Sequence, residues 1–161
     1  MNTEFRRAIV PNEIRSLTLF DHKAFQRYPL DWFDRDDWKT LDSWWMIVNR
    51  RKVGCCAFEP HMDFQEDVRE DGQNLRLQGS LYIVTTGILP QFRGLGFGSL
   101  LKHWQVLYAR YHGFTRIVTN TREGNRAMIC LNEKFGFKIL RTAPNYYEKP
   151  QESTVVMELH L

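Results

Sequence analysis

A glycine-rich stretch precedes an apolar, helix-like pattern in the middle of the chain. Residues 90–102 read PQFRGLGFGSLLK, with glycine at every second position from Gly94 to Gly98. The first amides of a helix have no partner within it and, together with the helix dipole, they attract anions. Glycines let a phosphate approach those amides because no Cβ stands in the way. The pattern predicts a phosphate-binding loop, and a tight turn that only packs is the alternative.

Basic residues surround this stretch. No Asp or Glu lies between Asp71 and Glu123, an interval that holds Arg76, Arg93, Lys102, Arg110, Arg116 and Arg122. This distribution suits a polyanionic ligand, or else it forms a basic solvated face. The net charge of +3 is too small to indicate nucleic-acid binding by itself.

Two other groups of polar residues are less informative. Residues 59–71 (EPHMDFQEDVRED) hold six acids and one arginine, which predicts an exposed loop. Three cysteines are an odd number, and Cys55 and Cys56 are neighbours that would point to opposite faces of a strand. We expect buried, inert thiols rather than a disulfide or a metal site.

Length and composition limit the class of protein. With 161 residues, of which 43% are hydrophobic, residues 1–161 are expected to form a single domain with a sizeable core. No apolar run approaches the roughly 20 residues of a membrane span, and MNTEFRRAIV has charges where a signal peptide would be apolar. A cytoplasmic protein is expected.

Hydrophobic periodicity and turn residues predict alternating strands and helices. Strands are expected at 4–10, 43–49, 53–59, 79–89, 115–120, 137–142 and 153–159. Helices are expected from Pro11, around 31–41, from Phe97 to Gly113, and at 124–136 with Gly136 as the C-terminal cap. The order is strand, two helices, three strands, helix, strand, helix, two strands, which predicts a mixed α/β sheet with helices on its faces.

The glycine stretch does not match two common nucleotide motifs. It has neither G-x-x-x-x-G-K-[ST] nor G-x-G-x-x-G followed by an acid. It resembles the acyl-CoA loop of the GCN5-related N-acetyltransferase (GNAT) superfamily, whose signature is [QR]-x-x-G-x-[GA]. Both Gln91-x-x-Gly94-x-Gly96 and Arg93-x-x-Gly96-x-Gly98 fit, and the second is preferred because family members read V-x-P-x-x-R-G-x-G-x-G-x-x-L-[LM].

A second stretch resembles the same superfamily. Residues 122–128 (REGNRAM) and 132–137 (NEKFGF) match R-E-x-N-x-x-[AM] and [YN]-E-K-x-G-F. With the order of elements, the resemblance covers residues 3–160. It implies one GNAT domain with a mixed, mostly antiparallel, seven-stranded sheet flanked by about four helices.

The resemblance also implies acetyl-CoA as the acyl donor and no metal. Backbone amides of Gly87, Ile88 and Leu89 would bind the pantetheine arm and the thioester oxygen. The pyrophosphate would be bound by the main chain of Arg93, Gly94, Leu95, Gly96, Phe97, Gly98 and Ser99. Asn125 would bind pantetheine, or else it only caps the following helix.

The acid and base of the superfamily are replaced in this chain. An alkylammonium has a pKa of about 10 and must lose a proton before it attacks a thioester. The frequent base positions fall at Thr86 and Asn120, and the tyrosine acid falls at Asn132, which can still hydrogen-bond the leaving sulfur. Our hypothesis for the base is Glu59 acting through water, with Tyr147 or Tyr146 near the amine. The alternative is that Glu59 is a surface carboxylate.

Aromatic residues are candidates for the acceptor site. Trp32, with Phe33 and Trp38, lies in the segment that usually walls this site in the superfamily. Asn145-Tyr146-Tyr147, expected in a loop, is similar to the stretch with which N-terminal acetyltransferases hold a peptide. Both groups are equally consistent with core or rim aromatics.

The resemblance therefore implies an N-acetyltransferase that moves an acetyl group directly to a primary amine of a small molecule or peptide. Alternatives are a ribosomal-protein-like N-terminal acetyltransferase, a catalytically silent CoA-binding regulatory module, and a nucleic-acid binder. The expected partner is the amine acceptor, with no nucleic acid and no membrane, and a homodimer is left open.

Overall fold

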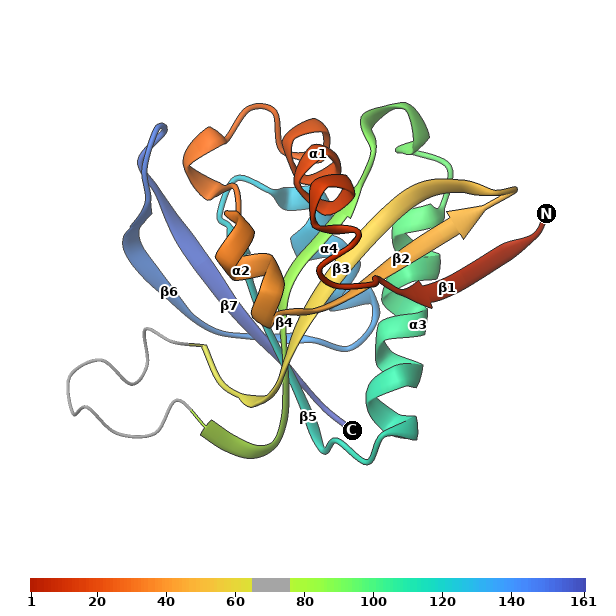
Figure 1. The fold of residues 1–161 in the computed structure, drawn as a ribbon. Coiled ribbons are helices and arrows are strands. Elements are labelled where there is room, and N and C mark those ends of the chain that lie inside the picture. The colour runs from red at the N-terminus through yellow and green to blue at the C-terminus, as the bar shows by residue number, and fades with distance from the viewer. Residues whose placement is uncertain (65–75) are drawn as a thin grey trace. The chain divides into compact units, whose positions relative to one another are not determined.

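The computed structural model describes residues 1–64 and 76–161, and the chain is traced from red to blue in Figure 1. The strands are β1 (Thr3–Arg7), β2 (Asp42–Val48), β3 (Arg51–Met62), β4 (Arg76–Ile88), β5 (Arg116–Arg122), β6 (Lys138–Tyr147) and β7 (Glu152–His160). The helices are α1 (Ile14–Ala24), α2 (Arg35–Thr40), α3 (Phe97–Tyr111) and α4 (Arg126–Lys134). In this described part, no helix combines the length and apolarity needed to cross a bilayer.

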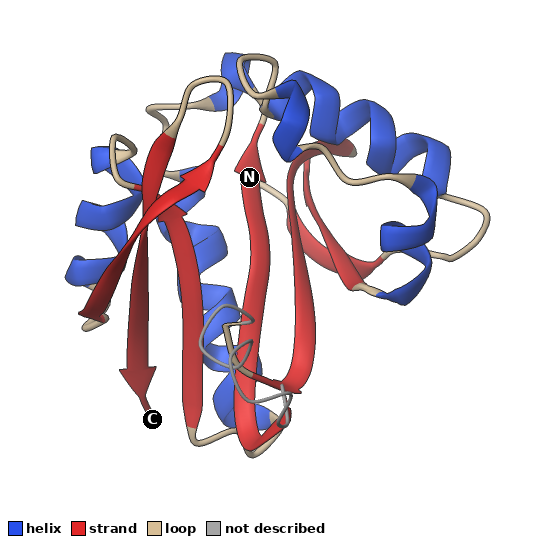
Figure 2. Cartoon of the chain, turned by 90° about the vertical axis from the view of Figure 1, so that its left-hand side faces the viewer, coloured by secondary structure: helices blue, strands red, loops and turns tan. Residues whose placement is uncertain are grey.

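The strands form one seven-stranded sheet in the order β1-β2-β3-β4-β5-β7-β6. Figure 2 draws the strands in red and the helices in blue. The pairs β1–β2, β2–β3, β5–β7 and β6–β7 are antiparallel, whereas β4 and β5 are parallel. A parallel pair needs a crossover connection, which α3 provides. The predicted mixed, mostly antiparallel sheet with four helices is confirmed.

The chain divides into two compact units. Unit 1 comprises Met1–Phe58 and Thr85–Leu101, and unit 2 comprises Glu59–Val84 and Lys102–Leu161. Both β4 and α3 contribute residues to each unit. A single domain over residues 1–161 stays a prediction.

In unit 1, α1 buries the apolar face that its periodicity predicts. Ile14, Leu17, Phe20 and Ala24 are buried, and the Phe20 ring lies 5.6 Å from the Trp45 ring of β2 in an edge-on contact. Asp34 and Asp37 form a reciprocal capping box at the start of α2. The capping box begins the helix at Arg35, several residues later than expected.

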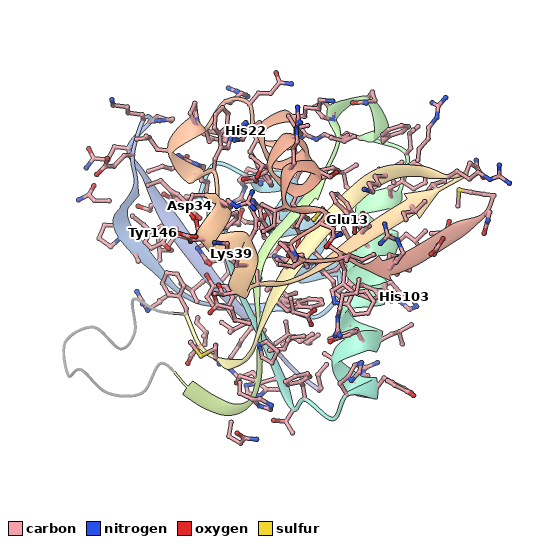
Figure 3. All side chains as sticks on the ribbon, in the orientation of Figure 1. Glu13, His22, Asp34, Lys39, His103 and Tyr146 are labelled. Atoms are coloured by element: carbon pink, nitrogen blue, oxygen red, sulfur yellow. The ribbon has the colours of Figure 1, made fainter. Side chains whose placement is uncertain are left out.

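The carboxylate of Glu13, labelled in Figure 3, ties the chain before α1 to two strands of unit 1. Arg6 of β1 donates two hydrogen bonds to it, at 2.9 and 3.0 Å. Lys52 of β3 and the Ile9 amide donate at 3.0 and 2.7 Å. Four donors on one half-buried carboxylate fix where α1 starts.

In unit 2, α4 ends as its glycine predicts. Gly136 has a φ of 92° and its amide donates to the Glu133 carbonyl, while the Phe137 amide donates to the Asn132 carbonyl. These two bonds form a Schellman cap, which requires the left-handed residue that glycine supplies most readily.

Three expectations from the sequence need correction. Residues 59–62 of the acidic segment belong to β3 rather than to a loop, and its residues 65–71 lie outside the described part. Residues 145–147 lie in β6, not in the following loop. Cys55 and Cys56 are buried and free as expected, but Cys130 is exposed on α4.

Candidate active site

The glycine-rich loop follows β4 through a short 3-10 turn at Pro90–Phe92. Gly94 and Gly96 have φ values of 75° and 87°, the left-handed region that favours glycine. A Cβ built on either residue would meet no atom within 4 Å. The loop therefore has open space beside it and needs its glycines for backbone conformation.

The amides of this loop form a row of available donors. Within residues 1–64 and 76–161, no carbonyl or side chain accepts a hydrogen bond from the amides of residues 94–99. The first bond of the helix runs from the Leu100 amide to the Gly96 carbonyl, at 3.1 Å. Unpaired donors at a helix start, with no Cβ in front of them, fit a diphosphate.

Arg93 does not belong to that row. Its amide donates to the Pro90 carbonyl at 3.2 Å. Its side chain donates to the carbonyls of Ile88 and Ala24, at 2.9 and 2.6 Å. Arg93 thus fixes the loop to the end of β4 and to α1.

The end of β4 is closely packed within unit 1. A Cβ on Gly87 would lie 3.2 Å from the Phe25 ring, and a Cβ on Gly54 would lie 2.9 Å from the Ile88 side chain. The Leu89 amide donates to the Val53 carbonyl at 3.0 Å, so it is already bound. Of the three predicted pantetheine-binding amides, those of Gly87 and Ile88 remain as candidates.

The pairing of β4 with β5 is short. It covers Ser80–Ile83 against Arg116–Thr119, which leaves residues 84–88 outside the register among the described pairs. The rest of β5 pairs with β7 on its other side. Among the described pairs, the end of β4 therefore does not pair with β5.

Several cations of the basic interval have partners within the protein. Lys102 is buried, with its ammonium 5.3 Å from the centre of the Phe137 ring. Arg116 forms ion pairs with Asp63 and Glu158, at 3.1 and 2.8 Å. Most of the cations whose side chains are described thus have internal partners; Arg110 is exposed, and the side chain of Arg76 lies outside the described part.

Unit 2 contains a polar network around Asn120 of β5. The Tyr82 hydroxyl donates to Asn120 Oδ1. Asn120 Nδ2 donates to the Tyr147 hydroxyl at 3.2 Å and to Thr154 Oγ1 at 3.1 Å. Thr154 Oγ1 in turn donates to the Thr121 carbonyl at 3.1 Å. Asn120 therefore connects three hydroxyl groups from β4, β6 and β7.

Arg122, at the end of β5, holds the hairpin between β6 and β7. Its guanidinium donates to the carbonyls of Pro150 and Glu148, at 3.0 and 3.4 Å, and to Glu152 Oε1 at 3.1 Å. It also lies over the Tyr147 ring, 4.3 Å from the centroid. Arg122 is therefore the anchor of the segment that carries Tyr147.

Tyr146, labelled in Figure 3, lies in an aromatic group. Its ring lies 5.4 Å from Phe64, which is fully buried, and 4.8 Å from Tyr147. Phe64 also contacts Tyr82 edge-on at 6.3 Å. Tyr146 itself is 37% exposed, so it is a rim residue rather than a core residue.

Charges near this group act on Tyr82. Burial raises the pKa of its hydroxyl well above 10, and Tyr146, Tyr147, Glu59 and Asp63 raise it further. Tyr82 is therefore a hydrogen-bond donor and not a base at neutral pH. Glu59 is half-buried within β3, three residues before the strand ends at Met62.

The two predicted asparagines of α4 have structural contacts. Asn125 accepts a hydrogen bond of 3.2 Å from the Met128 amide and caps the helix, which was the alternative for this residue. Asn132 is fully buried and its Nδ2 contacts the Met157 sulfur at 3.6 Å. Its Oδ1 has no hydrogen-bond partner among the described residues, and a buried carbonyl oxygen of this kind is uncommon.

Trp32 lies between α1 and α2 in unit 1. Its ring stacks on His22 at 3.9 Å, and its Nε1 donates to the Phe25 carbonyl at 2.8 Å. Both contacts hold the indole against the end of α1. A role in acceptor binding stays a prediction.

The structure groups the predicted residues in two sets. The loop residues 87–99 and Trp32 lie in unit 1, whereas Glu59, Asn125, Asn132, Tyr146 and Tyr147 lie in unit 2. Sequence reasoning missed Tyr82 and Thr154. Tyr82 had a signal, because it is the one residue with a polar tip in the run Leu81–Val84, but Thr154 in a β-branched strand had none.

The sequence and the structure were compared with known proteins. A sequence model described as the Acetyltransferase (GNAT) family matches residues 12–137. N-alpha-acetyltransferase 50 of Danio rerio is 36% identical over 73 residues, which are 45% of this chain and 44% of that protein. The [ribosomal protein bS18]-alanine N-acetyltransferase of Haemophilus influenzae is 38% identical over 77 residues, which are 46% of this chain and 52% of that protein.

The chain therefore spans about half the length of the curated relatives it matches. Among solved structures, a chain of the NatC complex bound to Gag peptide and CoA has a TM-score of 0.74 at 16% identity. That alignment covers 100% of this chain and 99% of the other, and it shows a shared fold. Because the family model matches most of its length, this chain belongs to the Acetyltransferase (GNAT) family.

Proposed function

We propose that this chain is an acetyl-CoA-dependent N-acetyltransferase that moves the acetyl group directly to a primary amine. The observation that carries the proposal is the row of unpaired amides at residues 94–99, beside glycines with open space in place of side chains. Membership of the family supports it. So does the solved NatC relative, which was bound to CoA.

In this proposal, the amides of residues 94–99 bind the pyrophosphate of acetyl-CoA. The backbone of Gly87 and Ile88 binds the pantetheine arm, and Asn125 contributes only through its Nδ2, because its Oδ1 caps α4. Arg93 acts by shaping the loop. Asn132 is our candidate for a contact with the leaving sulfur, which as a thiolate needs a hydrogen-bond donor, here Nδ2. In the structure Asn132 is fully buried and its Nδ2 contacts the Met157 sulfur.

When bound, acetyl-CoA supplies an activated acetyl thioester. The acceptor arrives as an alkylammonium and must lose a proton before its lone pair can attack. Glu59 is our candidate for taking that proton through water, and the Tyr147 hydroxyl is our candidate for holding the nitrogen. Glu59 and Tyr147 both lie in unit 2, and both act electrostatically on Tyr82.

The acceptor class that we propose first is the α-amine of a peptide. The relatives from Danio rerio and Haemophilus influenzae are named as an N-alpha-acetyltransferase and a ribosomal-protein-alanine N-acetyltransferase, which supports this class. Tyr146 and Tyr147, neighbours at the end of β6, supply an aromatic rim for a peptide. A small-molecule amine is the other outcome of the test.

Binding of the donor can be tested before an acceptor is known. Saturating acetyl-CoA should raise the melting temperature, because a ligand that binds only the folded state stabilises it. Gly96→Ala should abolish that rise, since its Cβ projects into the open space beside the loop. Gly113→Ala is a matched control: its φ is 77° and its Cβ would also meet no atom, but it lies beyond α3.

Both alanine variants are expected to lose about 1 to 2 kcal/mol of stability from the left-handed backbone. Only Gly96→Ala should lose acetyl-CoA binding. If acetyl-CoA raised the melting temperature of both variants equally, the loop would not bind the donor. If acetyl-CoA did not raise the melting temperature of the wild type, the proposal would be wrong.

Turnover then separates an enzyme from a silent module. Release of CoA thiol is measured with a panel of peptides and small amines, at several pH values. Glu59→Gln should lower kcat/KM and remove the acidic limb of the pH–rate profile, the rise of kcat/KM as a base loses its proton, if Glu59 takes the proton. Donor binding without turnover of any amine would favour the regulatory module.

A further inference from the structure

We propose that Asn120 and Thr154 are positioning residues that together fix the direction of the hydrogen bonds at the Tyr147 hydroxyl, so that this hydroxyl meets the acceptor amine as a hydrogen-bond acceptor. This inference rests on the proposed function. It concerns Asn120, Tyr82 and Thr154, none of which need touch the substrate.

The direction of the network is set at its inner end. The Thr121 carbonyl can only accept, so Thr154 must use its hydroxyl proton on that carbonyl, 3.1 Å away. Thr154 Oγ1 then has only lone pairs for its other contacts. The Asn120 group 3.1 Å from it must therefore be the NH₂, which donates to it.

The orientation of the carboxamide follows, and with it the role of Tyr82. If Nδ2 faces Thr154, then Oδ1 faces Tyr82, and a carbonyl oxygen can only accept from the hydroxyl there. Burial keeps Tyr82 protonated, so this donor persists at the pH values of an assay. Asn120 is thus held at both ends of its carboxamide.

Tyr147 receives its direction from two of these groups. Asn120 Nδ2 donates its second proton to the Tyr147 oxygen at 3.2 Å. The contact of 3.3 Å between Tyr147 and Thr154 has two hydroxyls as candidates for the donor. Because Thr154 has already used its proton, Tyr147 is the donor, and its proton points toward Thr154.

The chemical consequence concerns the amine. A hydroxyl whose proton points into the protein interacts with a ligand through its oxygen lone pairs, so it favours a ligand that donates an N–H. An amine that donates N–H to Tyr147 keeps its own lone pair for attack on the thioester. A hydroxyl free to rotate could instead donate to that lone pair and block the attack.

The experiment uses a pair of variants at a buried position. Thr154→Val has nearly the shape of threonine but removes the oxygen that receives the Tyr147 proton, whereas Thr154→Ser keeps the hydroxyl. For the amine acceptor, kcat/KM is expected to fall about tenfold in Thr154→Val, the size of one lost hydrogen bond. Thr154→Ser should stay within about twofold of the wild type, and the affinity for acetyl-CoA should be unchanged in both.

A double-mutant cycle shows whether Thr154 acts through Tyr147. In a Tyr147→Phe background, Thr154→Val should cause no further loss of kcat/KM, because the hydroxyl that it orients is gone. Asn120→Leu should likewise lower kcat/KM in the wild-type background and cause no further loss in the Tyr147→Phe background. A structural role alone would give equal losses with and without the Tyr147 hydroxyl.

The outcomes are separable from failure of the proposed function. An active wild type with additive losses, or with Thr154→Ser as impaired as Thr154→Val, overturns this inference and leaves the acetyltransferase intact. A wild type that binds no acetyl-CoA and acetylates no amine removes the proposed function and this inference together.

Discussion

Among single residues, Asp21 shows how burial changes a carboxyl group. It lies on the inner face of α1 with 2% of its surface exposed, and its Oδ2 accepts a hydrogen bond of 2.9 Å from the Phe33 amide. Burial raises its pKa from 3.8 to about 6, partly offset by the Phe33 bond, and Asp31 and Asp37 raise it further. The Asp21 carboxyl connects α1 to the segment before α2. Because this carboxyl is ionised at neutral pH, the connection requires a buried charge, which destabilises the folded state.

Asp21→Asn should therefore stabilise the protein at high pH. The folded pKa lies above the unfolded value, so the folded state binds more protons between about pH 4 and 6 and stability falls as pH rises through this window. Asparagine keeps an oxygen for the Phe33 amide but has no charge. The variant should be up to about 3 kcal/mol more stable than the wild type at pH 8, and about equal near pH 4. Urea denaturation at both values measures this, and a gain that is independent of pH would contradict it.

The chemistry of single residues was predicted only in part. The glycine positions predicted a loop whose backbone needs glycine, and Gly94 and Gly96 do have positive φ values with open space beside them. That this loop binds the acyl donor stays a prediction. The partners of Arg93 and Asn125 could not be predicted. Arg93 binds a carbonyl 69 positions away in the sequence, and such a contact is decided by packing rather than by a local pattern.

At the scale of elements, the approach of β3 to the end of β4 depends on Gly54. A Cβ there would lie 2.9 Å from Ile88 Cδ1, 3.2 Å from Met46 Cβ and 3.3 Å from the Gly87 carbonyl oxygen. Two of these contacts involve β4 residues that we propose for the pantetheine arm. The strand end is therefore positioned by the absence of a side chain on its neighbour.

Gly54→Ala should disturb that strand end. The extra methyl is expected to destabilise the fold by about 1 to 3 kcal/mol, the usual range for overpacking a buried site. It should also weaken acetyl-CoA binding, measured by calorimetry, because Ile88 must move. Gly113→Ala again serves as the control with open space. Normal donor affinity in a destabilised Gly54→Ala would show that the strand end and donor binding are independent.

The hairpin of β6 and β7 depends on Arg122. Arg122→Leu removes its bonds to the Glu148 and Pro150 carbonyls and leaves Glu152 without its ion pair. Removing one partner of the Arg122–Glu152 ion pair should lower the free energy of unfolding by about 3 kcal/mol. Hydrogen exchange should increase over residues 141–153, and not over α3. Arg110→Leu, on an exposed arginine, should change neither quantity; unaltered exchange in Arg122→Leu would show that the strands hold the hairpin without it.

The elements themselves were mostly predictable, with errors at their ends. The periodic helices α1 and α3 were found because their apolar stripe is long and regular. The end of β6 was misread because Pro144 and Asn145 look like turn residues, and Asn145 does have a φ of 56°. In the structure the irregular register between Ala143 and Tyr147 accommodates them, and the pairing of β6 with β7 resumes at Tyr147.

At the scale of the whole molecule, the order of elements and two motifs in register were enough to predict the family fold. The distribution of charge along the sequence was not a guide to its distribution in space. Arg116 lies in an interval without acids, yet it pairs with Asp63 and Glu158, 53 and 42 positions away. A run of one sign in sequence therefore says little about a surface when strands bring distant residues together.

Stability of the whole chain as a function of pH combines groups that act in opposite directions. Hydrogen bonds from Arg6, opposed by burial and supported by Ile9 and Lys52, lower the pKa of Glu13 far below 4.5. Burial raises the pKa of Glu158, but Arg116 and His160 lower it more. These two carboxylates contribute stability that is complete above about pH 4.5 and lost as pH falls, whereas that of Asp21 is lost as pH rises. Stability should therefore peak near pH 5.

Glu13→Gln tests the acidic side of this profile. Without the charge, Arg6 and Lys52 lose their partner, so the variant should be about 2 kcal/mol less stable than the wild type at pH 7. Its stability should also fall less steeply between pH 5 and pH 3. In the wild type, Glu13 takes up a proton in this range in the unfolded state but stays ionised in the folded state, and glutamine has no such group. Urea midpoints at half-unit intervals measure both effects, with Glu133→Gln on the exposed face of α4 as the control. Parallel acid limbs in wild type and variant would mean that Glu13 is not among the groups whose protonation unfolds the protein.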